Sequence, residues 1–156
     1  KAETYFHIGI LVPDLKKALR EYREILGLEF HEPTAMPLAT LEQPGLTEIG
    51  LLNIAFSKAG PPYYELIEAT GTGLFSAAHG EGMHHAGVWM GDPQETLRAL
   101  EARKIKVIAI NRLPDGTPLT IFTHPTALSG IRIEYVNANF RPMVEHFLAT
   151  GRFPGA

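Results

Sequence analysis

The sequence contains an internal repeat, which constrains the fold more than any other feature. Residues 7–14 read HIGILVPD, and residues 85–92 read HAGVWMGD. In each copy a His precedes an apolar, strand-like run, and an Asp follows it where a helix can begin. An Asp is a good cap for a helix, because its carboxylate accepts hydrogen bonds from the free N–H groups of the first turn. The repeat therefore predicts two similar units, each about half of the chain.

Each copy is followed by the same order of predicted elements. Apolar residues recur at helical spacing from Leu15 to Leu26, and Gly27 ends this pattern. The second helix has Pro93 in its first turn, where Pro is tolerated, and extends to about Lys104. Residues 32–45, which contain three Pro, are predicted to form a loop. Apolar and β-branched runs predict strands at 5–12, 28–31, 48–57, 63–69, 85–90, 106–110, 119–124 and 131–137.

These patterns predict an α+β fold, in which two tandem βαβββ units form one curved mixed sheet with a cleft. A further helix at about 141–149 follows the repeat and could cover the core or contact a second subunit. We expect one domain over residues 1–156. Its parts are the first unit at 5–69, a Gly-rich linker at 70–82, the second unit at 83–137, and the C-terminal helix and tail at 138–156.

The composition excludes several classes of protein. A net charge of −3, with Lys and Arg scattered along the chain, argues against binding to nucleic acids or anionic membranes. Cys is absent, which excludes disulfides, thiol catalysis and thiolate metal sites. The sequence has no signal-peptide pattern and no apolar run of the roughly 18 residues that a membrane span needs. We therefore expect a soluble, cytoplasmic protein.

Two His and two Glu occupy matching places in the two units. His7 and His85 begin equivalent strands, and Glu65 and Glu134 lie in equivalent final strands. A single His or Glu in such a place is usually structural or solvent-facing, but the coincidence in both units favours a shared role. If the two halves of the sheet curl around one cleft, all four side chains can converge there. Imidazole and carboxylate ligands suit a divalent ion such as Zn, Ni, Co or Mn, and two buried carboxylates would repel each other without one.

The remaining His residues are weaker candidates for metal ligands. In a regular strand His84 would point to the face opposite to that of His85, so the sequence favours His85. Four other His residues have no counterpart in the other unit: His31, His79, His124 and His146.

The chain resembles the vicinal oxygen chelate superfamily, which has the glyoxalase and bleomycin-resistance fold. The resemblance is carried by His7, the VPDL turn at 12–15, the helix end at 22–28, GMHHA at 82–86, and Glu134. Within the superfamily the pattern is most similar to methylmalonyl-CoA epimerases. The resemblance implies a metal bound by the same four residues, a small-molecule substrate and a homodimer.

The resemblance also implies an acidic residue that transfers a proton. In the epimerases this Glu lies in a Glu-Gln-Gly stretch, which Glu42-Gln43-Pro44-Gly45 nearly matches, and Glu48 lies close by. Either Glu42 or Glu48 is a candidate for this role, and Glu134 is a candidate partner after it loosens from the metal. The second ligand is commonly Gln in the epimerases, whereas Glu65 here matches the lyases.

These observations predict a metal-dependent isomerase, epimerase or lyase that acts through a metal-stabilised enolate next to a carbonyl or thioester. One alternative is a metal-free protein of this fold that binds a small molecule, such as an antibiotic, without catalysis. The intact set of His and Glu residues argues against it. A further alternative is an Fe-dependent dioxygenase, but such sites present two His and one carboxylate, and Glu65 would be a fourth ligand.

Overall fold

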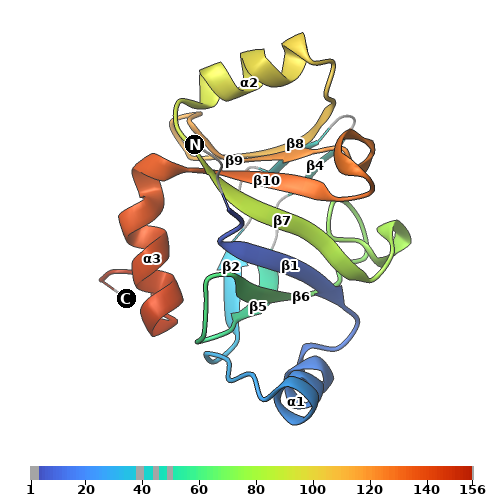
Figure 1. Cartoon of the computed structure of the whole chain (residues 1–156), viewed down its shortest axis with the longest axis vertical. Helices are drawn as coiled ribbons and strands as arrows, with labels where there is room; N and C mark the ends of the chain where they lie inside the picture. The colour runs from blue at the N-terminus through green and yellow to red at the C-terminus, as the bar shows by residue number, and fades with distance from the viewer. Residues whose placement is uncertain (1–3, 38–40, 44–45, 49–50, 156) are drawn as a thin grey trace.

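The structure is a computed structural model, and it describes residues 4–37, 41–43, 46–48 and 51–155 (Figure 1). Its helices are α1 (Leu15–Leu26), α2 (Pro93–Ala102) and α3 (Arg141–Thr150). Its strands are β1 (His7–Val12), β2 (Thr34–Pro37), β3 (Leu41–Gln43), β4 (Leu46–Glu48), β5 (Leu51–Phe56), β6 (Tyr63–Glu68), β7 (Gly82–Met90), β8 (Val107–Arg112), β9 (Pro118–Thr123) and β10 (Arg132–Asn137).

The described strands form one mixed sheet that shows the internal repeat. The strand order is β2-β5-β6-β1-β7-β10-β9-β8-β3-β4. In the first unit β1 pairs in parallel with β6, and in the second unit β7 pairs in parallel with β10. The two units meet where β1 and β7 run antiparallel at the middle of the sheet. The predicted α+β fold with two βαβββ units and a C-terminal helix is therefore confirmed.

The segment between α1 and β5 differs from the prediction. The prediction of a strand at 28–31 is wrong, because within this range only Phe30 pairs, in an isolated bridge to Ser57. The loop expected at 32–45 is also wrong, because it contains β2 and β3. Pro37 ends β2, which is an edge strand of the sheet. Proline, which has no N–H to donate, is tolerated in edge strands because one side of such a strand has no neighbouring strand to bond. The β3–β4 hairpin pairs with β8 and so adds residues of the first unit to the edge of the second.

The predicted Asp caps are present in both units. The Asp14 carboxylate accepts a hydrogen bond of 2.9 Å from the Lys17 N–H, and the Asp92 carboxylate accepts one of 2.8 Å from the Gln94 N–H. Gly27 ends α1 with a φ of 68°, a left-handed conformation that glycine adopts without strain. The Asp of each repeat copy therefore begins the helix of its unit.

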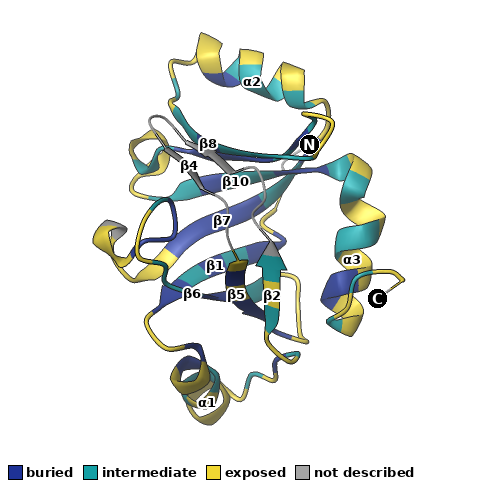
Figure 2. Cartoon of the chain, turned by 180° about the vertical axis from the view of Figure 1, so that it is seen from behind, coloured by how far each residue is buried: buried dark blue, intermediate teal, exposed yellow. Residues whose placement is uncertain are grey.

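Alternation along the central strands divides the side chains between the two faces of the sheet. On one face Val12 and Leu66 pack with Leu15 of α1, and Met90 and Ile121 pack with Leu100 of α2. The other face carries the largest buried cluster, which includes residues of both units. Figure 2 shows that the strands are mostly buried or half-buried, whereas the helices carry many exposed residues.

Helix α3 covers the side of the sheet that α1 and α2 leave open. Its Phe147 and Leu148 are buried in the largest cluster, where the Phe147 ring lies 5.8 Å from that of Phe56. The C-terminal helix thus covers the core, which is one of the two roles that the sequence predicts for it. Within the part of the chain that the structure describes, no helix is long and apolar enough to cross a membrane.

Candidate metal centre

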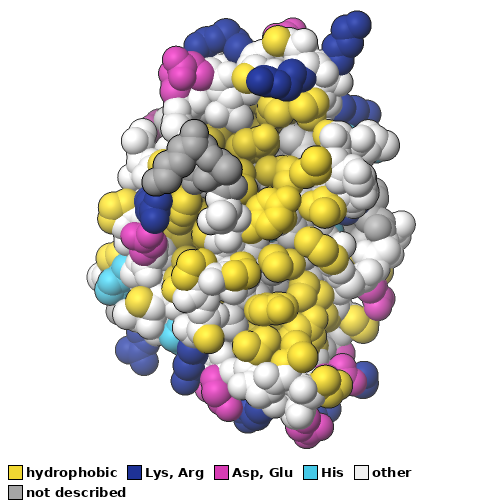
Figure 3. Space-filling model, in the orientation of Figure 1, with side chains coloured by type: hydrophobic (Ala, Val, Ile, Leu, Met, Phe, Trp, Pro, Cys, Tyr) yellow, Lys and Arg dark blue, Asp and Glu magenta, His cyan; other side chains and the backbone are white. Residues whose placement is uncertain are grey.

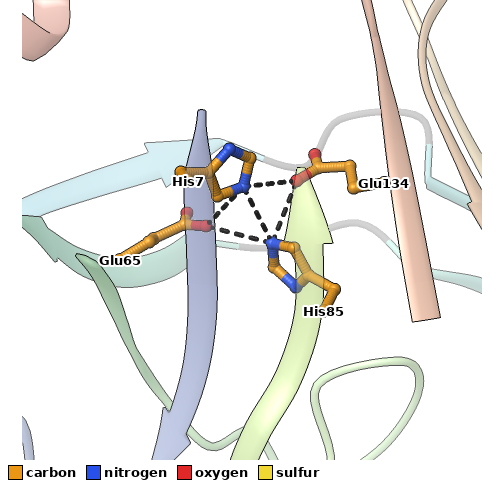
Figure 4. A group of neighbouring side chains, drawn as sticks. All are labelled: His7, Glu65, His85 and Glu134. Carbon is orange, nitrogen blue, oxygen red and sulfur yellow. Dashed lines mark hydrogen bonds and ion pairs between the residues drawn. The ribbon is translucent and has the colours of Figure 1, made fainter. Parts of the chain in front are cut away.

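The four residues singled out by the repeat lie together in the structure. His7, Glu65, His85 and Glu134 come from β1, β6, β7 and β10, the four central strands of the sheet. Each offers one ligand atom, and these four atoms lie within 4.8 Å of one another. Figure 4 shows the two imidazoles and the two carboxylates pointing at a common centre. All four side chains are largely buried.

The spacing of the donor atoms fits a metal ion. The two Nε2 atoms lie 3.0 Å apart, and Glu134 Oε2 lies 2.8 Å from that of His7 and 3.0 Å from that of His85. Glu65 Oε2 lies 3.5 Å and 3.3 Å from the same two nitrogens. Ligands bound tetrahedrally at about 2.0–2.1 Å lie about 3.3–3.4 Å from one another, and octahedral neighbours lie about 2.9 Å apart. The observed distances span these values, so the four residues could hold one ion.

Two glycines of the repeat make room for the two imidazoles. The antiparallel register of β1 and β7 places His7 opposite Gly87 and Gly9 opposite His85. A Cβ on Gly87 would overlap the His7 ring, and a Cβ on Gly9 would overlap the His85 ring, far inside the 3.0 Å that real Cβ atoms keep. Each His therefore lies across the glycine of the other unit. This role was not predicted from the sequence, although both copies of the repeat contain the His-x-Gly pattern.

His84 lies behind His85 and contacts it, although a regular strand predicts that the two side chains point to opposite faces. The β1–β7 register shifts after His85, because Gly9 pairs with His85 but Ile10 pairs with Met83. This bulge makes the assumption of a regular strand wrong at His84. The His84 side chain is buried beside that of His85, and their Nδ1 atoms lie 2.9 Å apart. Alternation alone could not reveal this placement, since a bulge interrupts the regular register.

The hydrogen bonds of His84 fix the tautomer of His85. Burial, aided by the neighbouring His85, lowers the pKa of His84 to about 3, so its ring is neutral. Its Nε2 lies 2.9 Å from the Leu74 carbonyl oxygen, which can only accept, and so Nε2 carries the proton. Nδ1 of His84 is then an acceptor, and His85 donates its Nδ1–H to it. His85 is thereby held with Nε2 facing the centre, as a metal ligand requires.

The carboxylates set the charge of the centre. Burial alone would lower the pKa of His85, but Glu134 and Glu65 outweigh it and raise that pKa to about 9. Burial alone would raise the pKa of Glu134, but His85 and His7 outweigh it and hold this pKa well below its usual range. In the metal-free protein His85 therefore carries a second proton, on Nε2, where a metal would bind. A divalent ion would displace this proton.

Among the described residues, the polar contacts of the His7 imidazole are all with residues of the centre. Its Nδ1 is buried and has no hydrogen-bond partner, whereas its Nε2 lies close to His85, Glu134 and Glu65. A metal would bind this same Nε2, and no hydrogen bond among the described residues orients the ring from Nδ1, in contrast to His85. The Phe6 ring, with its centroid 4.5 Å away, and the Phe56 ring pack against its edges and faces.

The two candidates for proton transfer lie in the hairpin that joins the second unit. Glu42 is in β3, opposite Thr47 and Ile110, and Glu48 is in β4, opposite Leu41. Leu41 in turn pairs with Asn111 of β8, which lines a cavity at the centre. The side chains of Glu42 and Glu48 lie outside the described part of the structure.

The four residues of the centre line a cavity of about 140 Å³. The cavity extends between the two halves of the sheet toward α3, and its walls are formed mainly by apolar side chains. Of the weaker His candidates, His31 does not line this cavity; its Nε2 lies 2.9 Å from the Leu148 carbonyl oxygen.

Comparisons with known proteins agree with this architecture. Mitochondrial methylmalonyl-CoA epimerase of Bos taurus is 27% identical over 139 residues, which cover 85% of this chain and 73% of the relative. The uncharacterized protein YqjC of Bacillus subtilis (strain 168) is 31% identical over 137 residues, covering 82% and 87%. A solved methylmalonyl-CoA epimerase in complex with methylmalonyl-CoA and NH4+ is 20% identical with a TM-score of 0.59, over 88% of this chain and 95% of that chain.

At 20% identity the solved structure supports the fold alone. The family assignment comes from the sequence. Residues 6–119 match the family described as the Glyoxalase/Bleomycin resistance protein/Dioxygenase superfamily. This match includes the strand with His7, the strand with Glu65 and the strand with His85. The chain therefore belongs to the glyoxalase/bleomycin resistance protein/dioxygenase superfamily.

Proposed function

We propose that this chain is a metal-dependent isomerase or epimerase, which moves a proton on a carbon next to a carbonyl or thioester group. The observation that carries the proposal is the convergence of two imidazoles and two carboxylates in the wall of a mainly apolar cavity. His7, Glu65, His85 and Glu134 would hold one Zn, Ni, Co or Mn ion. Such an ion, when bound, would supply positive charge that stabilises an enolate of the substrate.

The residues of the chain would carry out the proton transfer. Glu134 is an anionic and largely buried carboxylate, and one of its oxygens contacts both imidazoles. Its other oxygen is available to accept a proton from the α-carbon of a substrate and to return it. A second acidic residue on the opposite side would complete an epimerisation. The register favours Glu48 for this role, because its β-ladder neighbours lead to Asn111 at the cavity, whereas those of Glu42 lead to Ile110 in the cluster beneath α2.

The relatives support a thioester as the reacting group. Proteins named methylmalonyl-CoA epimerase are among the similar sequences, and a solved one binds methylmalonyl-CoA. We therefore propose that the substrate is a small acyl compound, with a CoA ester as its first candidate. The two alternatives, a binding protein without catalysis and an Fe-dependent dioxygenase, predict no metal-dependent exchange of an α-proton.

Exchange of the α-proton with solvent deuterium tests the proposal. Metal-free protein is loaded with Co, Ni, Mn or Zn and incubated with methylmalonyl-CoA in D2O, and mass spectrometry follows the label. We expect metal-dependent exchange that Glu134→Gln reduces by a factor on the order of 10²–10⁴. Glu81→Gln, at an exposed position just before the histidines of β7, is the matched control and should exchange like the wild type. Exchange that is absent with every metal, or unchanged in Glu134→Gln, would contradict the proposal.

We also propose that the protein forms a homodimer. Figure 3 shows a band of hydrophobic side chains over the middle of the sheet, between α1 and α2. Half-buried apolar residues of the central strands alternate with those that face the cavity; they include Ile8, Ile10, Val88 and Tyr135. Light scattering should give twice the 17.2 kDa mass of the chain. A mass of one chain at micromolar concentration would contradict this proposal.

A further inference from the structure

Among the described side chains, the cavity beside the four residues of the centre has few polar groups beyond them. Apart from His7, Glu65, His85 and Glu134, the polar residues that line it are Asn111 and Thr120. Among the described side chains, no Lys or Arg lines the cavity. A second charged group of a substrate would therefore lie in this cavity without a partner, which is costly in an apolar environment.

Aromatic rings form the wall nearest to the ligands. Phe6 and Phe56 lie beside His7, and the Phe122 ring lies perpendicular to that of His85 at 5.4 Å between centroids. Phe75, from the linker between the units, contacts Phe122 from the other side. All four rings line the cavity. Any group that extends from the metal centre into the cavity thus meets hydrocarbon on several sides.

Helix α3 and the tail after it form one wall of the cavity. Met143, Val144 and Phe147 of α3 and Phe153 of the tail line it, and the rings of Phe147 and Phe153 stack at 4.5 Å. These residues lie outside the duplicated units. The C-terminal addition therefore contributes to the wall of the cavity only apolar side chains.

The size of the cavity indicates the size of its occupant. Its volume of about 140 Å³ is close to that of an apolar protein cavity of about 150 Å³ that binds benzene. We propose that the substrate carries an apolar group about as large as a phenyl ring, which fills this cavity toward α3 while the oxygen pair of the substrate lies at the four ligands. This inference rests on the proposed function for the oxygen pair and adds the class of the substituent.

The binding of two matched dicarboxylates tests the inference without catalysis. Methylmalonate and benzylmalonate have the same oxygen pair, and benzylmalonate carries a phenyl ring in place of one hydrogen of the methyl group. Titration calorimetry on protein loaded with Co or Zn measures both affinities. Burial of a phenyl ring predicts that benzylmalonate binds at least about tenfold more tightly. Equal or weaker binding of benzylmalonate, or no binding of either compound, would overturn the inference.

A variant of α3 tests whether the phenyl ring binds in the part of the cavity that α3 lines. Val144→Phe adds a ring inside the cavity, and we expect it to reduce the affinity for benzylmalonate at least tenfold while methylmalonate binds as before. His146→Phe adds the same ring at an exposed position of the same helix and should change neither affinity. Unchanged benzylmalonate binding in a folded Val144→Phe protein would overturn the inference. If Val144→Phe does not fold, the wild-type comparison still decides.

This test is separate from that of the proposed function. A preference for benzylmalonate without deuterium exchange would refute the proposed isomerase activity but support the proposed apolar substituent. Deuterium exchange without the preference would refute the inference about the substituent alone.

Discussion

Replacement of Gly87 by Ala should displace the proposed metal ligand His7 while leaving the His7 side chain itself unchanged. Gly87 lies opposite His7 in the antiparallel register, and a Cβ at this position would overlap the His7 imidazole. Real Cβ atoms keep at least 3.0 Å from other heavy atoms, so the ring or the strand must move. Metal–ligand distances tolerate shifts of only about 0.2 Å. His7 Nε2 should therefore leave the position at which it meets the other three donor atoms.

The expected loss of affinity is large. Changes to residues that merely orient metal ligands reduce affinity by about 10–100-fold. Gly87→Ala moves the ligand itself, so we expect a loss of at least about 100-fold, which corresponds to about 2.7 kcal/mol of binding free energy. Overpacking of a buried position should also reduce the free energy of unfolding by about 1–3 kcal/mol. The variant should thus fold but bind metal weakly.

Competition with a chromophoric chelator measures the affinity, and thermal unfolding without metal measures the fold. Gly9→Ala should behave in the same way, since its Cβ would overlap the His85 ring. Gly91→Ala is the matched control, because a Cβ there meets nothing within 4 Å. A folded Gly87→Ala protein with wild-type metal affinity would refute the reasoning that His7 binds the metal across this glycine.

Three further predictions concern the neighbours of the centre. His84→Phe keeps the ring that packs on Phe75 but removes the acceptor of the His85 Nδ1–H, so metal affinity should fall about 10–100-fold in the chelator assay. Because the pKa of His85 is raised to about 9 in the metal-free protein, metal binding at pH 7 should release about one proton. The affinity should then rise as the pH approaches 9 and level off above it, and calorimetry in two buffers of different ionisation enthalpy measures the release. Phe147→Ala removes a buried ring between α3 and the sheet and should reduce the free energy of unfolding by about 3–5 kcal/mol in urea titrations. Affinity unchanged in His84→Phe, a heat independent of the buffer, or a loss below 1 kcal/mol in Phe147→Ala would each contradict its prediction.

The repeat predicted the two units, their helix caps and the four residues of the centre. It could do so because each rests on a local pattern or on equivalence between the copies. Asp14 and Asp92 act within one helical turn. His7 and His85 occupy equivalent places, and duplication alone implies equivalent surroundings for them.

The features that the sequence did not predict depend on contacts between distant segments. The bulge at His84 interrupts the register between β1 and β7, and alternation assumes that no bulge is present. The β3–β4 hairpin pairs with β8 of the other unit, so no pattern near β3 contains its partner. The role of Gly9 and Gly87 became visible only with the register between β1 and β7.

The content of bound metal tests the central claim most directly. Protein purified without chelator and then dialysed against Zn, Co, Ni or Mn is analysed for each element, together with a His85→Ala variant and the exposed-site control His146→Ala. The account predicts about one divalent ion per chain in the wild type and the control, and loss of the ion in His85→Ala. No ion in the wild type with any of the four metals, or one retained by a folded His85→Ala protein, would contradict it.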